Sequence, residues 1–207
     1  MDSLVFFLNF LVTMFSVLDP FGCAVALLAL TPGLAGEHRA EQAQRAVKAA
    51  AVVLVVFALL GGAIFAVFGI SIQALMVAGG LILVQVSFKM LAGESLAYRR
   101  SKPEMREAET KEDIAIIPMA VPMLAGPAAI TTVMVFANRA SGFADWVMLF
   151  ASLGLVLYLT HVILQRSEMI ANWLGDIGLR VLTRLMGLIL IAMGAEFVLS
   201  GLKGYFE

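Results

Sequence analysis

The sequence has few of the residues that build metal sites, disulfides and soluble surfaces. Its 207 residues include one cysteine, Cys23, and two histidines, His38 and His161. A single cysteine excludes an internal disulfide and a thiolate metal cage, and two distant histidines are too few for a zinc site. Only 14% of the residues are charged, against about 25% in an average soluble domain. We therefore expect neither a soluble protein nor a bound metal or other cofactor.

Recognisable catalytic motifs are also missing from the chain. We find no paired nucleophile and base, no run of metal ligands and no phosphate-binding loop. An enzyme is therefore the least favoured class of function, and no nucleic-acid partner is predicted.

Apolar residues, by contrast, make up 61% of the chain. They fall into blocks of 20 or more with almost no charge, which is typical of transmembrane helices in a lipid bilayer. Polar residues 33–48 form either an interfacial helix or the first turns of the second segment, and residues 166–183 an amphipathic connection. The predicted fold is an all-α integral membrane protein with six spans, at residues 4–30, 46–68, 72–92, 114–137, 143–165 and 184–202.

Two of these segments contain a proline close to a glycine near mid-length. The first is Asp19-Pro20-Phe21-Gly22, and the second, 107 residues later, is Gly126-Pro127-Ala128. Proline has no N–H to donate and clashes with the carbonyl four residues earlier, so we expect both helices to break. Broken backbone at membrane depth persists only inside protein or beside a wet cavity. Paired breaks in two halves of a chain therefore point to the binding site of a transporter.

The same offset of 107 residues relates the third helix of each half. It superposes Pro20 on Pro127 and Gly80-Leu81-Ile82-Leu83 on Gly187-Leu188-Ile189-Leu190. The alternative is chance matching in a chain rich in Gly and Leu, and the middle helices show no clear match. Three helices per half is an odd number, which predicts a 3+3 inverted repeat with helices 1 and 4 broken at mid-membrane. The repeats are residues 1–92 and 114–207, and residues 93–113 are a charged cytoplasmic linker.

Lysine and arginine are unevenly divided among the connections. Both ends and the connections between helices 2–3 and 4–5 hold only Arg139 and Lys203. The positive-inside rule therefore places both termini outside the cell. The other three connections hold eleven basic residues: Arg39, Arg45, Lys48, Arg99, Arg100, Lys102, Arg106, Lys111, Arg166, Arg180 and Arg184.

Three motifs carry a family resemblance: Leu18-Asp19-Pro20-Phe21-Gly22, Ala78-Gly79-Gly80-Leu81-Ile82-Leu83, and residues 114–132 with their three prolines. In these motifs the chain resembles the MarC family of bacterial and archaeal inner-membrane proteins. The resemblance implies six transmembrane helices, a multi-pass inner-membrane location and transport of small neutral amino acids such as glycine or alanine. The family often has Asn before the first proline, whereas Asp19 adds a titratable group here.

The two breaks supply the predicted substrate-binding residues. Asp19 is either a functional carboxylate for an ammonium, a cation or a proton, or only the N-cap of the second half-helix. Small residues either let a ligand reach backbone N–H groups or serve helix packing. Hydroxyls, including that of Thr132, either line the site or bond back to their own helix. The predicted set is Ser16, Asp19, Pro20, Phe21, Gly22, Gly126, Pro127, Ala128, Ala129 and Thr131.

The offset of 107 also superposes Lys89 on Glu196. Opposite charges at equivalent positions either pair across the pseudo-two-fold axis or snorkel separately to water.

The predicted function is secondary transport of a small polar solute, coupled to a proton or a sodium ion. A channel or exporter for a small solute and a non-transporting membrane scaffold are the alternatives. The sequence also leaves a homo-oligomer open.

Overall fold

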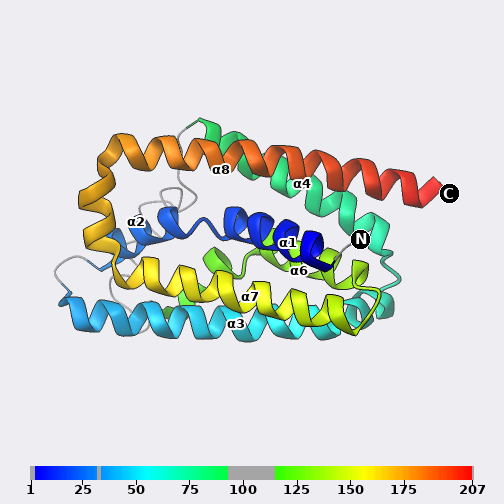
Figure 1. Cartoon of the computed structure of the whole chain (residues 1–207), viewed down its shortest axis with the longest axis horizontal. Helices are drawn as coiled ribbons and strands as arrows, with labels where there is room; N and C mark the ends of the chain where they lie inside the picture. Colours follow the sequence, from blue (N-terminus) through cyan, green and yellow to red (C-terminus); the bar gives the residue numbers. More distant parts are fainter. Residues whose placement is uncertain (1–2, 32–33, 93–114, 207) are drawn as a thin grey trace.

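A computed structural model describes residues 3–31, 34–92 and 115–206, and the elements in these ranges are helices (Figure 1). Five segments are long and apolar enough to cross a membrane, the first of them Leu4–Leu28, which covers most of the first two helices below. A bent pair, Ala115–Leu124 and Pro127–Arg139, gives six if it is counted as one span. The elements are α1 (Ser3–Leu18), α2 (Pro20–Leu30), α3 (Gly36–Val67), α4 (Ile72–Leu91), η2 (Ala115–Leu124), α6 (Pro127–Arg139), α7 (Phe143–Gln165) and α8 (Ser167–Phe206).

Two predicted boundaries differ from the structure. The polar residues from Gly36 onward are the first turns of the 32-residue helix α3, which was one of the two alternatives. The predicted connection at residues 166–183 is shorter in the structure, because the element α8 starts at Ser167, turns sharply at Gly175 and continues into the last span. Gly175 has a φ of 59°, a conformation that glycine adopts without steric cost. The apolar span then starts at Ile177, not at Arg184. The predicted linker, residues 93–113, lies outside the described residues.

Helices α4 and α8 pack against each other in opposite directions along the molecule (Figure 1). A Cβ atom added at Gly80 would lie 2.6 Å from the carbonyl oxygen of Gly194, and one at Gly194 would lie 2.8 Å from that of Gly80. Only glycine permits this approach at both positions. Small residues are a common means of helix association in membranes, since they let van der Waals contacts extend along the backbone.

Among the five long spans, the first is the most enclosed. In its most apolar stretch 67% of the residues are buried, against 22–39% in the other long spans. Phe10, Met14 and Leu27 of this span have no exposed surface. Apolar side chains such as Val52 and Leu188 instead face outward on the surrounding helices, as a lipid-facing surface requires. The Asp19–Pro20 interruption is therefore held in the centre of the molecule.

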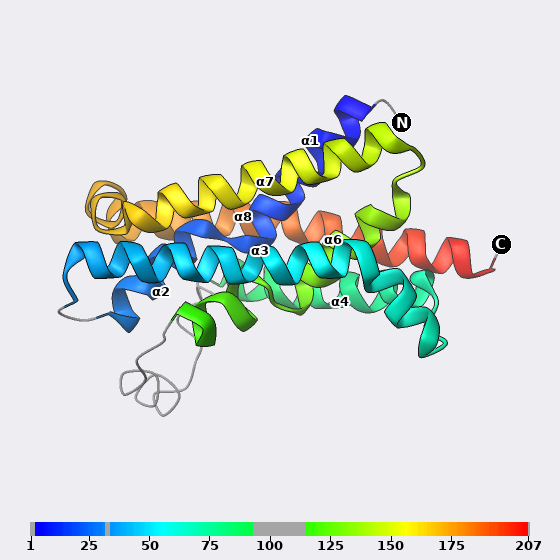
Figure 2. The ribbon, with the colours of Figure 1, turned by 90° about the horizontal axis from the view of Figure 1, so that it is seen from below.

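The bundle has two distinct ends (Figures 1 and 2). The start of α1, the end of α8 and the α6–α7 connection lie at one end, which we call the terminal end. The end of α2, the start of α3 and the start of α8 lie at the other, which we call the Arg39 end.

Candidate functional site

The first interruption is a single residue, Asp19, between α1 and α2. Asp19 has a left-handed conformation, with φ 42° and ψ 65°, and Pro20 is the first residue of α2. The Asp19 side chain accepts a hydrogen bond from the Gly22 N–H through Oδ1 at 3.1 Å. This is the geometry of a helix N-cap. The Asp19 carbonyl also accepts from Cys23 at 2.9 Å, so the helical bonds resume immediately.

The rest of the Asp19 side chain is enclosed without a partner. Asp19 is 1% exposed, and its Oδ2 has no hydrogen-bond partner among the described residues. The same holds for the hydroxyl of Thr132, which has no exposed surface. Buried polar atoms are usually satisfied, because an unmade hydrogen bond costs about 1–3 kcal/mol. Two such oxygens in the described structure call for an explanation.

The second interruption is longer. Ile117 and Val121 have extended conformations inside η2, because each precedes a proline and a proline disfavours the helical conformation of the residue before it. Gly126 is extended as well, and Pro127 is the first residue of α6. Helices η2 and α6 meet at an angle of 54°. Both interruptions therefore end in a proline that starts a new helix.

One cavity of about 250 Å³ lies between the two interruptions. Its wall includes Val17, Leu18 and Cys23 from the first interruption, and Ile82 and Val86 from α4. The second interruption contributes the remaining lining residues: Pro122, Met123, Gly126, Pro127, Ala128 and Ala129.

Backbone groups give this cavity its polar character. The N–H groups of Ala128 and Ala129, in the first turn of α6, have no acceptor among the described residues. The carbonyls of Pro122 and Met123, in the last turn of η2, have no donor there. Helix ends leave these groups unpaired, and the α6 start is the positive end of a helix dipole whereas the η2 end is a negative one. Residues from two opposite helix ends, one with unpaired donors and one with unpaired acceptors, therefore line the same cavity.

Gly126 makes this arrangement possible. A Cβ atom at this position would lie 2.4 Å from the carbonyl oxygen of Pro122. Any other residue would have to push that carbonyl away.

The predicted residues divide between this cavity and its surroundings. Gly126, Pro127, Ala128 and Ala129 line it. Pro20 and Gly22 are buried at the first interruption, and the Phe21 ring contacts Phe15 with centroids 6.1 Å apart. These three residues and Asp19 are not among the lining residues.

The two predicted hydroxyl residues also lie outside the lining. Ser16 Oγ donates to the Val12 carbonyl of its own helix at 2.9 Å, which is the alternative expected for membrane hydroxyls. Thr131 packs on Gly79, where a Cβ atom would lie 1.9 Å from the threonine methyl.

Sequence reasoning did not assign several lining residues to the site, namely Val17, Leu18, Cys23, Ile82, Val86, Pro122 and Met123. Four of them stand within the family motifs: Leu18 in the first, Ile82 in the second, and Pro122 and Met123 in the third. The motif on α4 supported the predicted repeat and the family resemblance, but nothing in it assigned α4 to the site.

The structure does not bring Lys89 and Glu196 together. Gly80 contacts Gly194, and Ser87 contacts Gly187, so paired residue numbers on α4 and α8 sum to 274. Glu196 therefore lies opposite residue 78, which is 11 residues from Lys89, or about 16 Å along the helix at 1.5 Å per residue. No ion pair joins the two within the described ranges. Glu196 instead lies near Arg139 at the terminal end.

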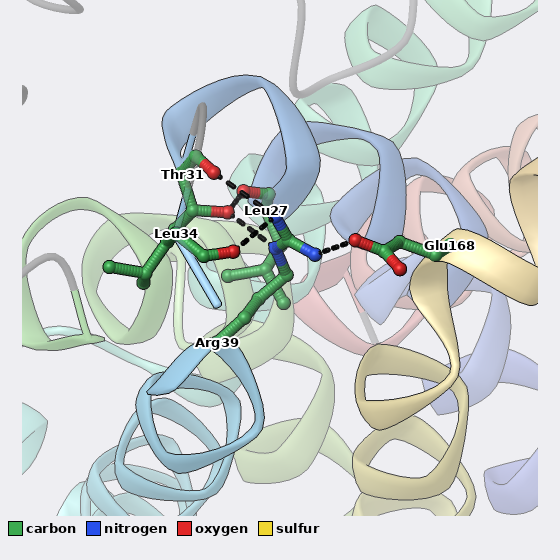
Figure 3. A network of polar contacts seen from close by, with 5 residues as sticks. All are labelled: Leu27, Thr31, Leu34, Arg39 and Glu168. Atoms are coloured by element: carbon green, nitrogen blue, oxygen red, sulfur yellow. Dashed lines mark hydrogen bonds and ion pairs between the residues drawn. The ribbon is translucent and has the colours of Figure 1, made fainter. Parts of the chain in front are cut away.

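Arg39 ties three helices together at the other end of the bundle (Figure 3). The side chain of Arg39 is almost fully buried, and its Nε donates to the Thr31 hydroxyl at 2.8 Å. Its Nη2 donates to the carbonyls of Thr31 and Leu34 at 3.1 and 3.0 Å, and its Nη1 pairs with Glu168. The guanidinium thus fixes the end of α2 against α3 and α8. Sequence analysis used Arg39 only as a topology signal.

Comparisons with known proteins agree with a membrane bundle. Residues 4–206 match the model of a family described as MarC family integral membrane protein. A UPF0056 membrane protein of Methanocaldococcus jannaschii is 36% identical over 204 residues, covering 99% of this chain and 98% of that protein. The UPF0056 membrane protein YvbG of Bacillus subtilis is 33% identical, with coverages of 97% and 96%. YhcE of Escherichia coli is 28% identical, with coverages of 97% and 93%. No solved structure matches.

Proposed function

The chain belongs to the MarC family of integral membrane proteins, and on this premise we propose that it is a secondary transporter of small neutral amino acids such as glycine and alanine. The transport is coupled to a proton or a sodium ion. Its site is the cavity between the two interruptions, which lie at mid-membrane.

The observation that carries this proposal is the meeting of opposite helix ends in one small cavity. A zwitterion needs donors for its carboxylate and acceptors for its ammonium group. The free N–H groups of Ala128 and Ala129 suit the carboxylate, and the free carbonyls of Pro122 and Met123 suit the ammonium. The volume of about 250 Å³ is below the roughly 300–1,000 Å³ of drug-sized ligand sites, which favours a small solute.

Helix packing supports the inverted 3+3 repeat. Helix α1 packs on α7 as η2 packs on α3, and α2 packs on α8 as α6 packs on α4. Each contact turns into the other when the two halves exchange places. At residue level, the offset of 107 turns the Gly80–Gly194 contact into Gly187–Ser87, which the structure contains. Such exchange is what a pseudo-two-fold axis requires, and it supports a transporter whose halves rock around a central site.

Asp19 is the residue we assign to coupling. Its Oδ1 caps α2, which leaves Oδ2 for a proton or a cation. A carboxylate at mid-membrane is costly unless it is paired or protonated, so occupancy of this oxygen by a proton or cation stabilises the protein. The cap keeps α2 in place in either state.

We also propose that both termini face the outside of the cell, on the basis of the eleven-to-two distribution of Lys and Arg. A cysteine at Ser101, in a Cys23→Ser background, should then resist impermeant thiol reagents in intact cells. Labelling from outside would reverse the orientation.

The proposal is tested by uptake of radiolabelled glycine and alanine into proteoliposomes, with and without imposed proton and sodium gradients. We expect saturable uptake that one of the gradients drives above equilibrium. Uptake that only equilibrates would favour the channel alternative, and no uptake in either direction would favour the scaffold.

A further inference from the structure

A second and larger cavity lies at the terminal end of the bundle, and we call it the terminal vestibule. Its volume is about 630 Å³, and none of its lining residues borders the central cavity. Its polar lining comes from α1, from the α6–α7 connection and its flanks, and from α8: Asn9, Arg139, Ser141, Asp145, Glu196 and Ser200.

Arg139 is held over aromatic rings, and its N–H groups donate to none of the described residues. The central guanidinium carbon lies 5.8 Å from the centroid of the Phe136 ring and 5.4 Å from that of Phe197. Both distances are within the range of a cation–π interaction. Arg139 makes no hydrogen bond or ion pair with a described residue. A cation–π contact depends on the positive charge of the guanidinium and uses none of its hydrogen-bond donors. The N–H groups in the guanidinium plane therefore stay available for a carboxylate.

The two acidic residues of the vestibule are in different situations. Asp145 accepts hydrogen bonds from the N–H and the hydroxyl of Ser141, at 3.1 and 3.0 Å, and so fixes the start of α7. Glu196 accepts one bond, from the Ser200 hydroxyl at 3.0 Å on Oε1. It lies close enough to Arg139 to interact electrostatically, without an ion pair of 4.0 Å or less. A cation and a carboxylate thus stand near each other with room between them.

We propose that the terminal vestibule is a second binding site, which takes a small zwitterion with its carboxylate on Arg139 and its ammonium group on Glu196. Phe6 and Phe136 provide an apolar wall for a short side chain. The vestibule rests on the proposed function only for the identity of the solute, since its charges by themselves select a zwitterion.

An aromatic wall closes the vestibule toward the core, so the vestibule is a binding site separate from the central cavity. Phe136 packs against Phe10 and Phe197, with centroids 5.0 and 6.3 Å apart, and neither of these two rings has any exposed surface. The rings under Arg139 therefore belong to the buried core. A solute that enters here binds first in the vestibule, and the aromatic cluster must rearrange before it goes further.

The proposal can be tested by protection of a cysteine in the vestibule. Met193→Cys, in a Cys23→Ser background, places a thiol on the vestibule wall, and Ile70→Cys places one at an exposed position outside it. The rate of alkylation by N-ethylmaleimide is measured on the purified protein in nanodiscs. Alanine should slow the reaction at Met193→Cys and leave Ile70→Cys unchanged. Acetate and methylammonium, which carry one charge each, should need at least tenfold higher concentrations.

Charge variants assign the protection to the named residues. Arg139→Gln and Glu196→Gln should each raise the half-protecting alanine concentration at least tenfold, whereas Arg184→Gln, a matched change at another exposed arginine, should not. Gly126→Ala, which alters only the central cavity, should keep the protection. Equal protection by alanine and by acetate, or full protection in both Arg139→Gln and Glu196→Gln, would overturn the proposal. Two variants guard against a failure of either to fold.

A parallel uptake assay separates this proposal from the transport proposal. Uptake without protection refutes the vestibule site alone. Protection without uptake keeps the vestibule site and refutes transport.

Discussion

Replacing Gly126 by alanine is the sharpest perturbation of the central cavity. The new Cβ atom would lie 2.4 Å from the carbonyl oxygen of Pro122, whereas ordinary van der Waals contact begins at 3.4 Å. The carbonyl or the start of α6 must therefore move by about 1 Å, since a backbone oxygen cannot rotate away like the tip of a side chain. This motion changes the spacing between the Pro122 and Met123 carbonyls and the Ala128 and Ala129 N–H groups.

The expected effects follow from that displacement. Overpacking of a close-packed site costs about 1–3 kcal/mol of folding stability. A hydrogen bond to a charged group contributes about 1.5–3 kcal/mol, so weakening one such bond to the solute lowers affinity tenfold or more. We expect Gly126→Ala to fold with a reduced Tm and to bind glycine and alanine at the central cavity at least tenfold more weakly.

The assay is equilibrium binding of radiolabelled alanine to purified protein, together with a thermal melt. Gly126→Ala and its control are compared in an Arg139→Gln background, which weakens the vestibule site, so that binding reports the central cavity. Gly62→Ala is the matched control, because a Cβ at this position of α3 meets no atom within 4 Å. It should bind as the wild-type protein does, with no loss of Tm. Wild-type affinity and Tm in Gly126→Ala would refute the placement of the solute between these helix ends.

Three further predictions concern coupling, packing and the Arg39 end. Asp19→Asn should fold with an unchanged Tm, since Asn caps helices about as well as Asp. It should lose gradient-driven accumulation of the solute, and an unchanged ion dependence of uptake in proteoliposomes would leave Asp19 as a cap only. Gly80→Ala should lower the Tm, because its Cβ would lie 2.6 Å from the Gly194 carbonyl oxygen. Gly154→Ala should not, because a Cβ there meets no atom within 4 Å, and equal Tm values for the two variants would contradict the α4–α8 packing. In a denaturant titration, Arg39→Gln should lower the free energy of unfolding by about 1–3 kcal/mol for each buried acceptor left unpaired. Glu168→Gln, at a side chain 65% exposed, should lower it by at most about 1 kcal/mol. The reverse order of these two costs would show that the ion pair, not the carbonyl bonds, holds this end.

The helix interruptions were predictable because proline acts locally. Pro20 and Pro127 each start a helix in the structure, and Ile117 and Val121 are extended because each precedes a proline. The same chemistry indicated Asp19 as a helix cap, and its bond to Gly22 shows the cap, while a functional role of this carboxylate stays a prediction. What the chain chemistry could not supply is the wall that α4 adds to the cavity, because it depends on how distant helices pack.

The Lys89–Glu196 pair shows where the proposed offset of 107 does not predict a contact. Residues related by this offset touch only where their numbers also sum to 274, which places the proposed two-fold axis near Leu83 and Leu190. Both side chains are fully buried there. Lys89 lies six residues beyond that point, so its equivalent lies far away on the opposite side of the axis. Equivalence under a two-fold axis therefore predicts contact close to the axis and separation elsewhere.

The Arg39 cluster and the start of the last span also depended on tertiary structure. Arg39 reads as a surface residue in its polar stretch, and only the fold brings Thr31, Leu34 and Glu168 around it. Gly175 ends the first part of α8 in a sharp turn, and the residues around Gly175 contain no signal that predicts this turn.

The most direct test of the central claim is an electron cryomicroscopy map of the protein in nanodiscs, recorded at saturating alanine and compared with a map recorded without it. The account predicts added density between the N–H groups of Ala128 and Ala129 and the carbonyls of Pro122 and Met123, with α2 and α6 each starting at its proline. A central cavity that is identical in the two maps, or a continuous helix through residues 115–139, would contradict it.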